Sequence, residues 1–311
     1  MRIKASPRTA RILAAVNAIV SFRYTALLTA ALVLLGLVAP ASAQLLVGED
    51  DPLEPIWAVD VVTNQAQPVL SGFGAVAMAV DGNTNTLYFM TNTVTLYKWD
   101  LDTPANPPTL VGTTQNTSAQ NLSLTGLAFD NTNNKLYASR TLDSASGPEG
   151  FYELDPNTAV GTLRVAVTAS QFDFGGFDWD PATGSFYANS DVGTAGIYRI
   201  DPVGGGVNFV APYPATSDNP PDIDGLAVGD GRVWMVEDRA VQTGGKVYVY
   251  NIASGQYETP LQTPWFFNET FAGATYIPNF GSFMAQIPEP ASGGALMLLG
   301  VSALARRRRV Q

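Results

Sequence analysis

The chain has 311 residues, of which 46% are apolar and only 14% are charged, with 29 glycines and 21 prolines. This composition favours an all-β protein with many tight turns over a helical one. The chain contains no cysteine, so disulfides and thiolate metal sites are excluded. It contains no histidine either, so imidazole metal sites and a catalytic histidine are also excluded.

The charges are distributed unevenly along the chain. The net charge is −10, yet five basic residues precede position 44 and four arginines stand near the C-terminus. The region between them holds all 27 acidic residues and only 8 of the 17 basic ones. Such an acidic body repels polyanions, so we expect no nucleic-acid partner. It suits a secreted protein.

Residues 1–43 have the pattern of a signal peptide. A basic region is followed by the apolar run TALLTAALVLLGLVAP and by Ala41-Ser42-Ala43, the small-x-small pattern of a cleavage site. The pattern predicts a helical export segment that is removed before Gln44. The basic region is long, so the translation start is open, and a retained N-terminal membrane anchor is the alternative.

The region 44–286 repeats itself about every 49 residues. The copies GAVAMAVDGNTNTLYFMTN, LTGLAFDNTNNKLYASR, FGGFDWDPATGSFYANS, IDGLAVGDGRVWMVED and FAGATYIPNFGSFMAQ begin near 74, 124, 174, 223 and 271. Each copy opens with a small residue and an apolar strand, turns on Asn, Asp or Gly, and continues with a second strand that carries an aromatic residue. The aligned small residues are Ala77, Gly126, Gly176, Gly225 and Gly273.

A second signature, aromatic-x-apolar-Asp/Asn, marks the other half of each unit. It begins at Tyr97, Tyr152, Tyr198 and Tyr248, and each copy leads into a polar turn and a further strand. One unit therefore contains four strands in about 49 residues, which is typical of a β-propeller blade.

The fifth unit lacks its second half at the C-terminal end. Trp57 and Asp60 repeat the missing signature near the N-terminus, and the strand QPVL follows. We therefore expect a five-bladed β-propeller in which residues 55–70 supply two strands of the last blade, beside a strand that carries Phe283. Ring closure would protect sheet edges. A pair of β-sandwiches and a six-bladed ring with one degenerate blade are the alternatives.

Ligands of propellers commonly bind at one mouth of the central channel, by fold-level analogy. The residues expected there are polar and differ between repeats. The candidates are Asn92, Arg140, Asn189, Asp191, Asp222, Asp224, Glu237 and Asp238, with Asp173 and Arg239 nearby. Side chains of this kind also form ordinary solvated rims, so their positions alone do not establish a site.

Two other interpretations of the polar residues concern metals. Asp81, Asn83 and Asn85 place oxygens at alternate positions, as the first part of a calcium loop does, but the bidentate Glu of an EF-hand is missing and the segment must also form a hairpin turn. A metal-dependent lactonase-like hydrolase would use acids and amides such as Glu237, Asp191, Asp222 and Asn92. No spacing among them is diagnostic, so we expect no cofactor, with calcium as the exception to test.

The last segment, 287–311, contains Pro288-Glu289-Pro290, then 15 uncharged residues from Ala291 to Ala305, and then Arg306, Arg307, Arg308 and Arg309. As a helix the uncharged run would span about 22 Å, short of a bilayer core of about 30 Å, and the arginines favour the cytoplasmic side. In these three parts and their order the segment resembles the PEP-CTERM sorting signal of Gram-negative bacteria, although Ile287 stands where valine is commoner. A plain short membrane anchor is the alternative.

The resemblance implies an exosortase-type processing enzyme as partner, transient attachment to the membrane, and a place at the cell envelope, the outer surface or outside the cell, often where exopolysaccharide is made. We therefore expect an exported cell-surface or matrix protein, a binding or structural propeller more readily than an enzyme. The metal-dependent hydrolase is the alternative.

Overall fold

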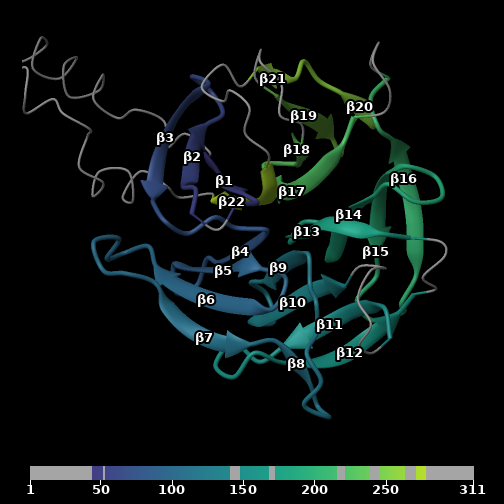
Figure 1. The fold of residues 1–311 in the computed structure, drawn as a ribbon. Coiled ribbons are helices and arrows are strands. Elements are labelled where there is room, and N and C mark those ends of the chain that lie inside the picture. The colour runs from purple at the N-terminus through teal and green to yellow at the C-terminus, as the bar shows by residue number, and fades with distance from the viewer. Residues whose placement is uncertain are drawn as a thin grey trace, which may run out of the picture. The chain divides into compact units, whose positions relative to one another are not determined.

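The computed structural model describes residues 44–51, 53–140, 148–167, 172–215, 221–238, 245–262 and 271–277. These residues form an all-β ring of five small sheets, a five-bladed β-propeller (Figure 1). The fold and the blade number predicted from the repeats are confirmed. The predicted signal peptide 1–43 and sorting segment 287–311, with their expected helices, lie outside the described residues. Among the described residues there is no helix long and apolar enough to cross a membrane.

Each blade is an antiparallel sheet whose first strand is innermost. Blade one contains β4 (Ala77–Asp81), β5 (Thr86–Asn92), β6 (Thr95–Asp100) and β7 (Thr109–Thr113). Blade two contains β9 (Gly126–Asp130), β10 (Lys135–Arg140), β11 (Gly150–Leu154) and β12 (Val160–Ala166), with the short β8 (Gln115–Asn116) parallel to β12. Blade three contains β13 (Phe174–Asp180), β14 (Ser185–Ser190), β15 (Gly196–Ile200) and β16 (Val207–Pro212).

The last two blades depart from this plan. Blade four contains β17 (Ile223–Gly229), β18 (Arg232–Glu237) and β19 (Lys246–Asn251), and its outer strand is split into β20 (Gln256–Tyr257) and β21 (Leu261–Gln262), both paired with β19. Blade five contains β22 (Phe271–Ile277), β1 (Gln44–Glu49), β2 (Ile56–Asp60) and β3 (Gln65–Leu70). The aromatic-x-apolar-Asp signature lies on the third strand of every blade.

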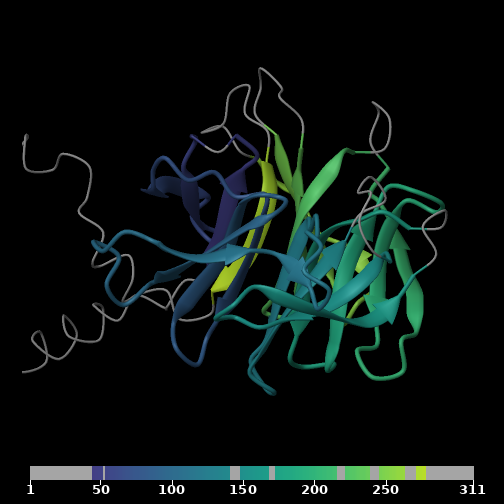
Figure 2. The same ribbon diagram turned by 60° about the horizontal axis from the view of Figure 1, so that its bottom comes forward.

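Blade five closes the ring with strands from both ends of the described chain. The contribution of N-terminal strands to the last blade was predicted, but the predicted number of strands was wrong. Three N-terminal strands, rather than two, join one C-terminal strand, because β1 pairs with β22 along its whole length. The yellow β22 lies beside the purple β1 in both views (Figures 1 and 2). The place expected for the strand that carries Phe283 is thus taken by β1, and Phe283 itself lies outside the described residues.

Small residues let the five inner strands approach one another around the axis. β4, β9, β13, β17 and β22 each pack against the next, and β22 packs against β4. A Cβ on Gly176 would lie 2.4 Å from the amide nitrogen of Leu226, and one on Gly273 would lie 2.4 Å from the carbonyl oxygen of Ala75. These distances are too short for any side chain, so the small residue at this position of the repeat is a packing requirement.

Apolar side chains fill the spaces between blades rather than a single central core. Tyr137 of blade two, for example, meets Phe186 of blade three with ring centroids 4.9 Å apart. Trp99, Trp179 and Trp234 are at least nine-tenths buried, whereas Trp57 is only partly buried against the cluster between blades four and five. Each blade is therefore stabilised by its neighbours, and blade five, which packs between blades four and one, closes the ring of these contacts.

A candidate functional site at the channel mouth

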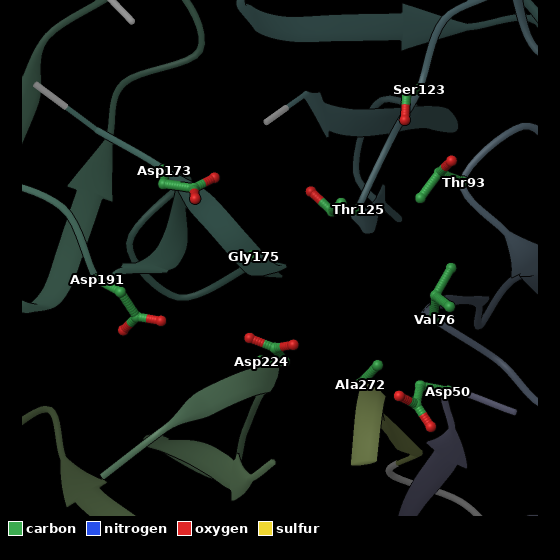
Figure 3. A pocket seen from close by; sticks show the side chains of 10 residues that line it. All are labelled: Asp50, Val76, Thr93, Ser123, Thr125, Asp173, Gly175, Asp191, Asp224 and Ala272. Carbon is green, nitrogen blue, oxygen red and sulfur yellow. The ribbon is translucent and has the colours of Figure 1, made fainter. Parts of the chain in front are cut away.

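A cavity of about 370 Å³ opens where the inner strands begin (Figure 3). Its wall is built from all five blades. The lining residues are Asp50, Val76, Thr93, Ser123, Thr125, Asp173, Gly175, Asp191, Asp224 and Ala272. Asp173, Asp191 and Asp224 gather on one side, and the hydroxyl groups of Thr93, Ser123 and Thr125 lie on the other (Figure 3).

The floor of the cavity is the tightly packed layer where the inner strands begin. Around Ala77, Gly126, Gly176, Leu226 and Gly273 the strands leave no room for a water molecule. The mouth is therefore a blind funnel and not the entrance to a channel through the ring. A ligand that enters it must leave by the same side.

The funnel is acidic. Among the ten described residues that line it, four are aspartates and none is lysine or arginine. One carboxylate oxygen from each of Asp191, Asp222 and Asp224 lies within 4.8 Å of the others. The three come together because Asn189, two residues before Asp191, donates a hydrogen bond from its amide to the carbonyl of Ile223, the residue between Asp222 and Asp224.

Burial and mutual repulsion change the acidity of these groups. Burial raises the pKa of Asp224 to about 8, and the neighbouring Asp238 adds to this rise. Burial also raises the pKa of Asp238 to about 6, and it raises the pKa of Asp191. The backbone N–H of Asp238 donates to the carbonyl of Asp222 at 2.8 Å, which fixes the two loops together. The mouth therefore holds protons near neutral pH, and a cation that enters would displace them.

The eight predicted mouth residues divide into two groups. Asp191 and Asp224 line the funnel, and Asp222 and Asp238 adjoin them. Arg140, Asn189 and Glu237 lie at the right strand ends but are buried, 2%, 1% and 8% exposed. Asn92 uses its side-chain oxygen to accept a hydrogen bond from the backbone N–H of Val94. These four side chains are either buried or hydrogen-bonded to the backbone, and they are not among the residues that line the funnel. Arg239 lies outside the described residues.

Several residues that line the funnel were not predicted from the sequence. Asp50 lines the funnel from the loop after β1, a strand that the sequence did not predict. Thr93, Ser123 and Thr125 carry common polar side chains in the loops, and no pattern distinguishes them. The stretch FGGFDWD contains one distinguishing residue, because Asp178 stands where three of the other four repeats have Ala79, Ala128 or Ala227 and the last has Thr275.

Asp178 is a buried carboxyl that joins two blades beneath the funnel. It accepts hydrogen bonds from the backbone N–H of Val228, at 2.7 Å, and of Trp179, at 2.8 Å. Burial raises its pKa to about 8 despite these bonds. Because Val228 belongs to β17 of the next blade, Asp178 is a positioning group for the inner strands.

The calcium candidates lie in the turn between β4 and β5, at the other end of the inner strands. Asp81 accepts hydrogen bonds from the backbone N–H of Asn83 and the hydroxyl of Thr84. The side-chain amide of Asn83 donates to the carbonyl of Asn131, and that of Asn85 donates to Asp102. Their polar atoms thus serve the turn and a contact with blade two, and calcium there stays a prediction.

Comparison with known proteins yields fold similarity only. No family model and no curated protein matches the chain. A chain of a nidogen/laminin complex aligns over 75% of this chain and 98% of its own, at 11% identity and a TM-score of 0.51. A gluconolactonase from Xanthomonas campestris aligns over 75% and 80%, at 15% identity and a TM-score of 0.49. A protein of unknown function from Bacteroides thetaiotaomicron aligns over 76% and 62%, at 16% identity and a TM-score of 0.48.

Proposed function

We propose that this chain is an exported binding protein of the cell surface or extracellular matrix of a Gram-negative bacterium, and that its ligand occupies the acidic funnel. The observation that carries this proposal is the contrast between a regular scaffold and an irregular mouth. The five inner strands repeat closely, whereas the funnel residues differ from blade to blade and concentrate carboxylates and hydroxyls. Binding sites on rigid scaffolds are commonly built from such variable loops.

Export and processing enter the proposal from the two ends of the sequence. Cleavage after Ala43 would leave β1 whole, since the strand starts at Gln44. An exosortase-type enzyme would act at Pro288-Glu289-Pro290, beyond the last described strand. Intact-mass measurement of the protein isolated from a producing bacterium tests both steps. A mature chain that still contains residues 291–311 would contradict sorting, and one that still contains residues 1–43 would contradict cleavage.

A polysaccharide is the ligand class that the funnel chemistry favours. Carboxylates accept hydrogen bonds from sugar hydroxyls, and the funnel hydroxyls can both donate and accept them, as polar groups in ligand pockets do. An anionic exopolysaccharide would be repelled unless a divalent cation bridged it to the aspartates. A glycan array probed with and without calcium tests this choice. Binding that is lost in Asp191→Asn but kept in Asp155→Asn, an exposed turn variant, supports the funnel.

A metal-dependent hydrolase is the second candidate, favoured by the convergence of Asp191, Asp222 and Asp224. Three carboxylates can hold calcium or another divalent ion and leave positions for water. Calorimetric titration with Ca²⁺ and Zn²⁺ tests the ion site, and proton release at pH 6–7 should accompany binding because Asp224 must ionise. Absence of both heat and a thermal shift removes this candidate. If an ion binds, lactone hydrolysis separates a hydrolase from a cation-dependent binding protein.

A further inference from the structure

Both ends of the described ring leave it at the same pole. β1 and β22 are antiparallel, and Gln44, where the chain enters, pairs with Ile277, where it leaves. At the other end of the same pair, Glu49 faces Phe271, and the adjacent Asp50 and Ala272 line the funnel. The chain ends and the funnel thus lie at opposite ends of the inner strands.

The separation of these two poles is set by the length of the inner strands. β22 has seven residues, so its ends are about 20 Å apart at roughly 3.3 Å per residue. The funnel is blind, so it cannot be reached from the pole at which the chain enters and leaves. The ring therefore has one pole for a ligand and another for its terminal segments.

We infer that a ring held at a membrane by either terminal segment presents its acidic funnel away from that membrane. This inference rests on the export and sorting in the proposed function, during which the unprocessed chain is attached to the membrane, but it does not depend on which terminal segment attaches. Gln44 and Ile277 are paired, so the N-terminal segment and the C-terminal tail both attach the ring at the same pole. The funnel then meets soluble or matrix ligands and not lipid.

The lengths of the connections support this polarity. Three residues separate the apolar run that ends at Pro40 from Gln44, and thirteen separate Ile277 from Ala291. Fully extended, the paths from Pro40 to Gln44 and from Ile277 to Ala291 span at most about 14 Å and about 50 Å. For the funnel to face the membrane, the connection would have to follow a longer path around the blade. It would cross three inter-strand spacings of about 4.8 Å, from the inner strand to the outer edge, and then run about 20 Å along the strands to the funnel pole. The N-terminal connection is too short for this path, and the C-terminal one would have to extend over about two thirds of its full reach.

The absence of cysteine from the chain allows a direct test with single-cysteine variants. Ala182, in the turn between β13 and β14, marks the pole of the chain ends, and Thr194, in the loop between β14 and β15, marks the funnel pole. Both side chains are exposed and lie in one blade, at opposite ends of β14. Ala182→Cys and Thr194→Cys therefore form a matched pair.

Each full-length variant is labelled with a fluorophore and reconstituted into phosphatidylcholine vesicles with a quencher on the lipid headgroup. Flotation establishes attachment first. We expect quenching at position 182 to be several-fold stronger than at 194. Equal quenching, or stronger quenching at 194, in vesicles that float with the protein overturns the polarity alone. Failure to float overturns the membrane attachment of the unprocessed chain that sorting requires, and the polarity with it, and is recognised before any quenching is measured.

Discussion

At the scale of single residues, the inner strands are limited by the space between backbones. Gly176 lies so close to the next blade that a methyl group would meet the amide nitrogen of Leu226 at 2.4 Å. We predict that Gly176→Ala lowers the free energy of unfolding by about 1–3 kcal/mol, the usual cost of overpacking. Thermal unfolding checks this, with Gly206→Ala as control, because a Cβ there meets only Asn208, at 3.6 Å. Equal midpoints for the two variants would show that the blades can move apart freely.

The funnel carboxyls predict a pH dependence of stability. The pKa of Asp224 is about 8 in the folded protein against an ordinary value of 3.8, so the folded chain keeps a proton that the unfolded chain has lost. The free energy of unfolding should therefore fall as pH rises from about 4 to about 8 and level off above that. Asp178, with a pKa of about 8, acts in the same direction.

Asp224→Asn tests the sign of this dependence. The amide resembles the protonated acid, so the variant should lose less stability between pH 5 and pH 8 than the natural protein, and a smaller slope should remain because of Asp178. Chemical denaturation at several pH values measures both. Val62→Ala, which changes an exposed side chain that does not titrate, should keep the natural slope. A slope unchanged by Asp224→Asn would mean that Asp224 is ionised in the folded protein.

The sequence predicted residues well where a repeat constrained them. The glycines of the inner strands were found because each copy needs a small residue at the same place, and backbone contact explains that need. The funnel was found only in part. Asp191 and Asp224 were predicted because they lie at the ends of repeat strands. Arg140 and Glu237 lie at equivalent strand ends but are buried in the protein, whereas Asp50, which was not predicted, lines the funnel. Burial depends on neighbouring blades, which a single repeat does not reveal.

At the scale of elements, β1 is the strand whose place the sequence did not predict. Its residues, QLLVGE, carry no repeat signature and follow a predicted cleavage site, while the copy around Phe271 suggested its own partner strand. Pairing between strands more than 220 residues apart leaves no local pattern, because register is set by packing after the ring forms. Aromatic-x-apolar-Asp predicted β2 correctly because the turn chemistry is local: Asp60 accepts a hydrogen bond from the backbone N–H of Val62.

Leu46 tests whether β1 is an integral strand of blade five. Its side chain is fully buried and packs in one cluster with Ile56, Met78 and Phe89. We predict that Leu46→Ala costs about 2–5 kcal/mol of unfolding free energy, as expected for a leucine deleted from a packed core. Val62→Ala in the same blade, where the side chain is 73% exposed, should change stability by less than about 0.5 kcal/mol. Similar unfolding curves for both variants would argue against a buried β1.

At the scale of the whole molecule, the ring depends on one junction between distant parts of the chain. Val47 of β1 and Ala274 of β22 are direct partners across that junction. Because the chain has no cysteine, Val47→Cys with Ala274→Cys can form only one intramolecular disulfide, closing a loop of about 230 residues. Ile197→Cys with Ala211→Cys, partners in β15 and β16, closes a loop of about 15 residues in one blade.

Loop-closure entropy predicts that the junction disulfide stabilises the ring more than the disulfide within a blade. Comparing oxidised with reduced protein for each pair cancels the cost of the substitutions, and the logarithmic dependence on loop length gives a difference of about 2 kcal/mol in favour of the junction. Denaturant unfolding with and without reductant measures both gains. Strain at the new bond lowers either value, so cross-linking is scored first by mass. Failure of the junction pair to cross-link while the blade-three pair does would contradict closure by β1 and β22, and with it the shared exit of the two chain ends.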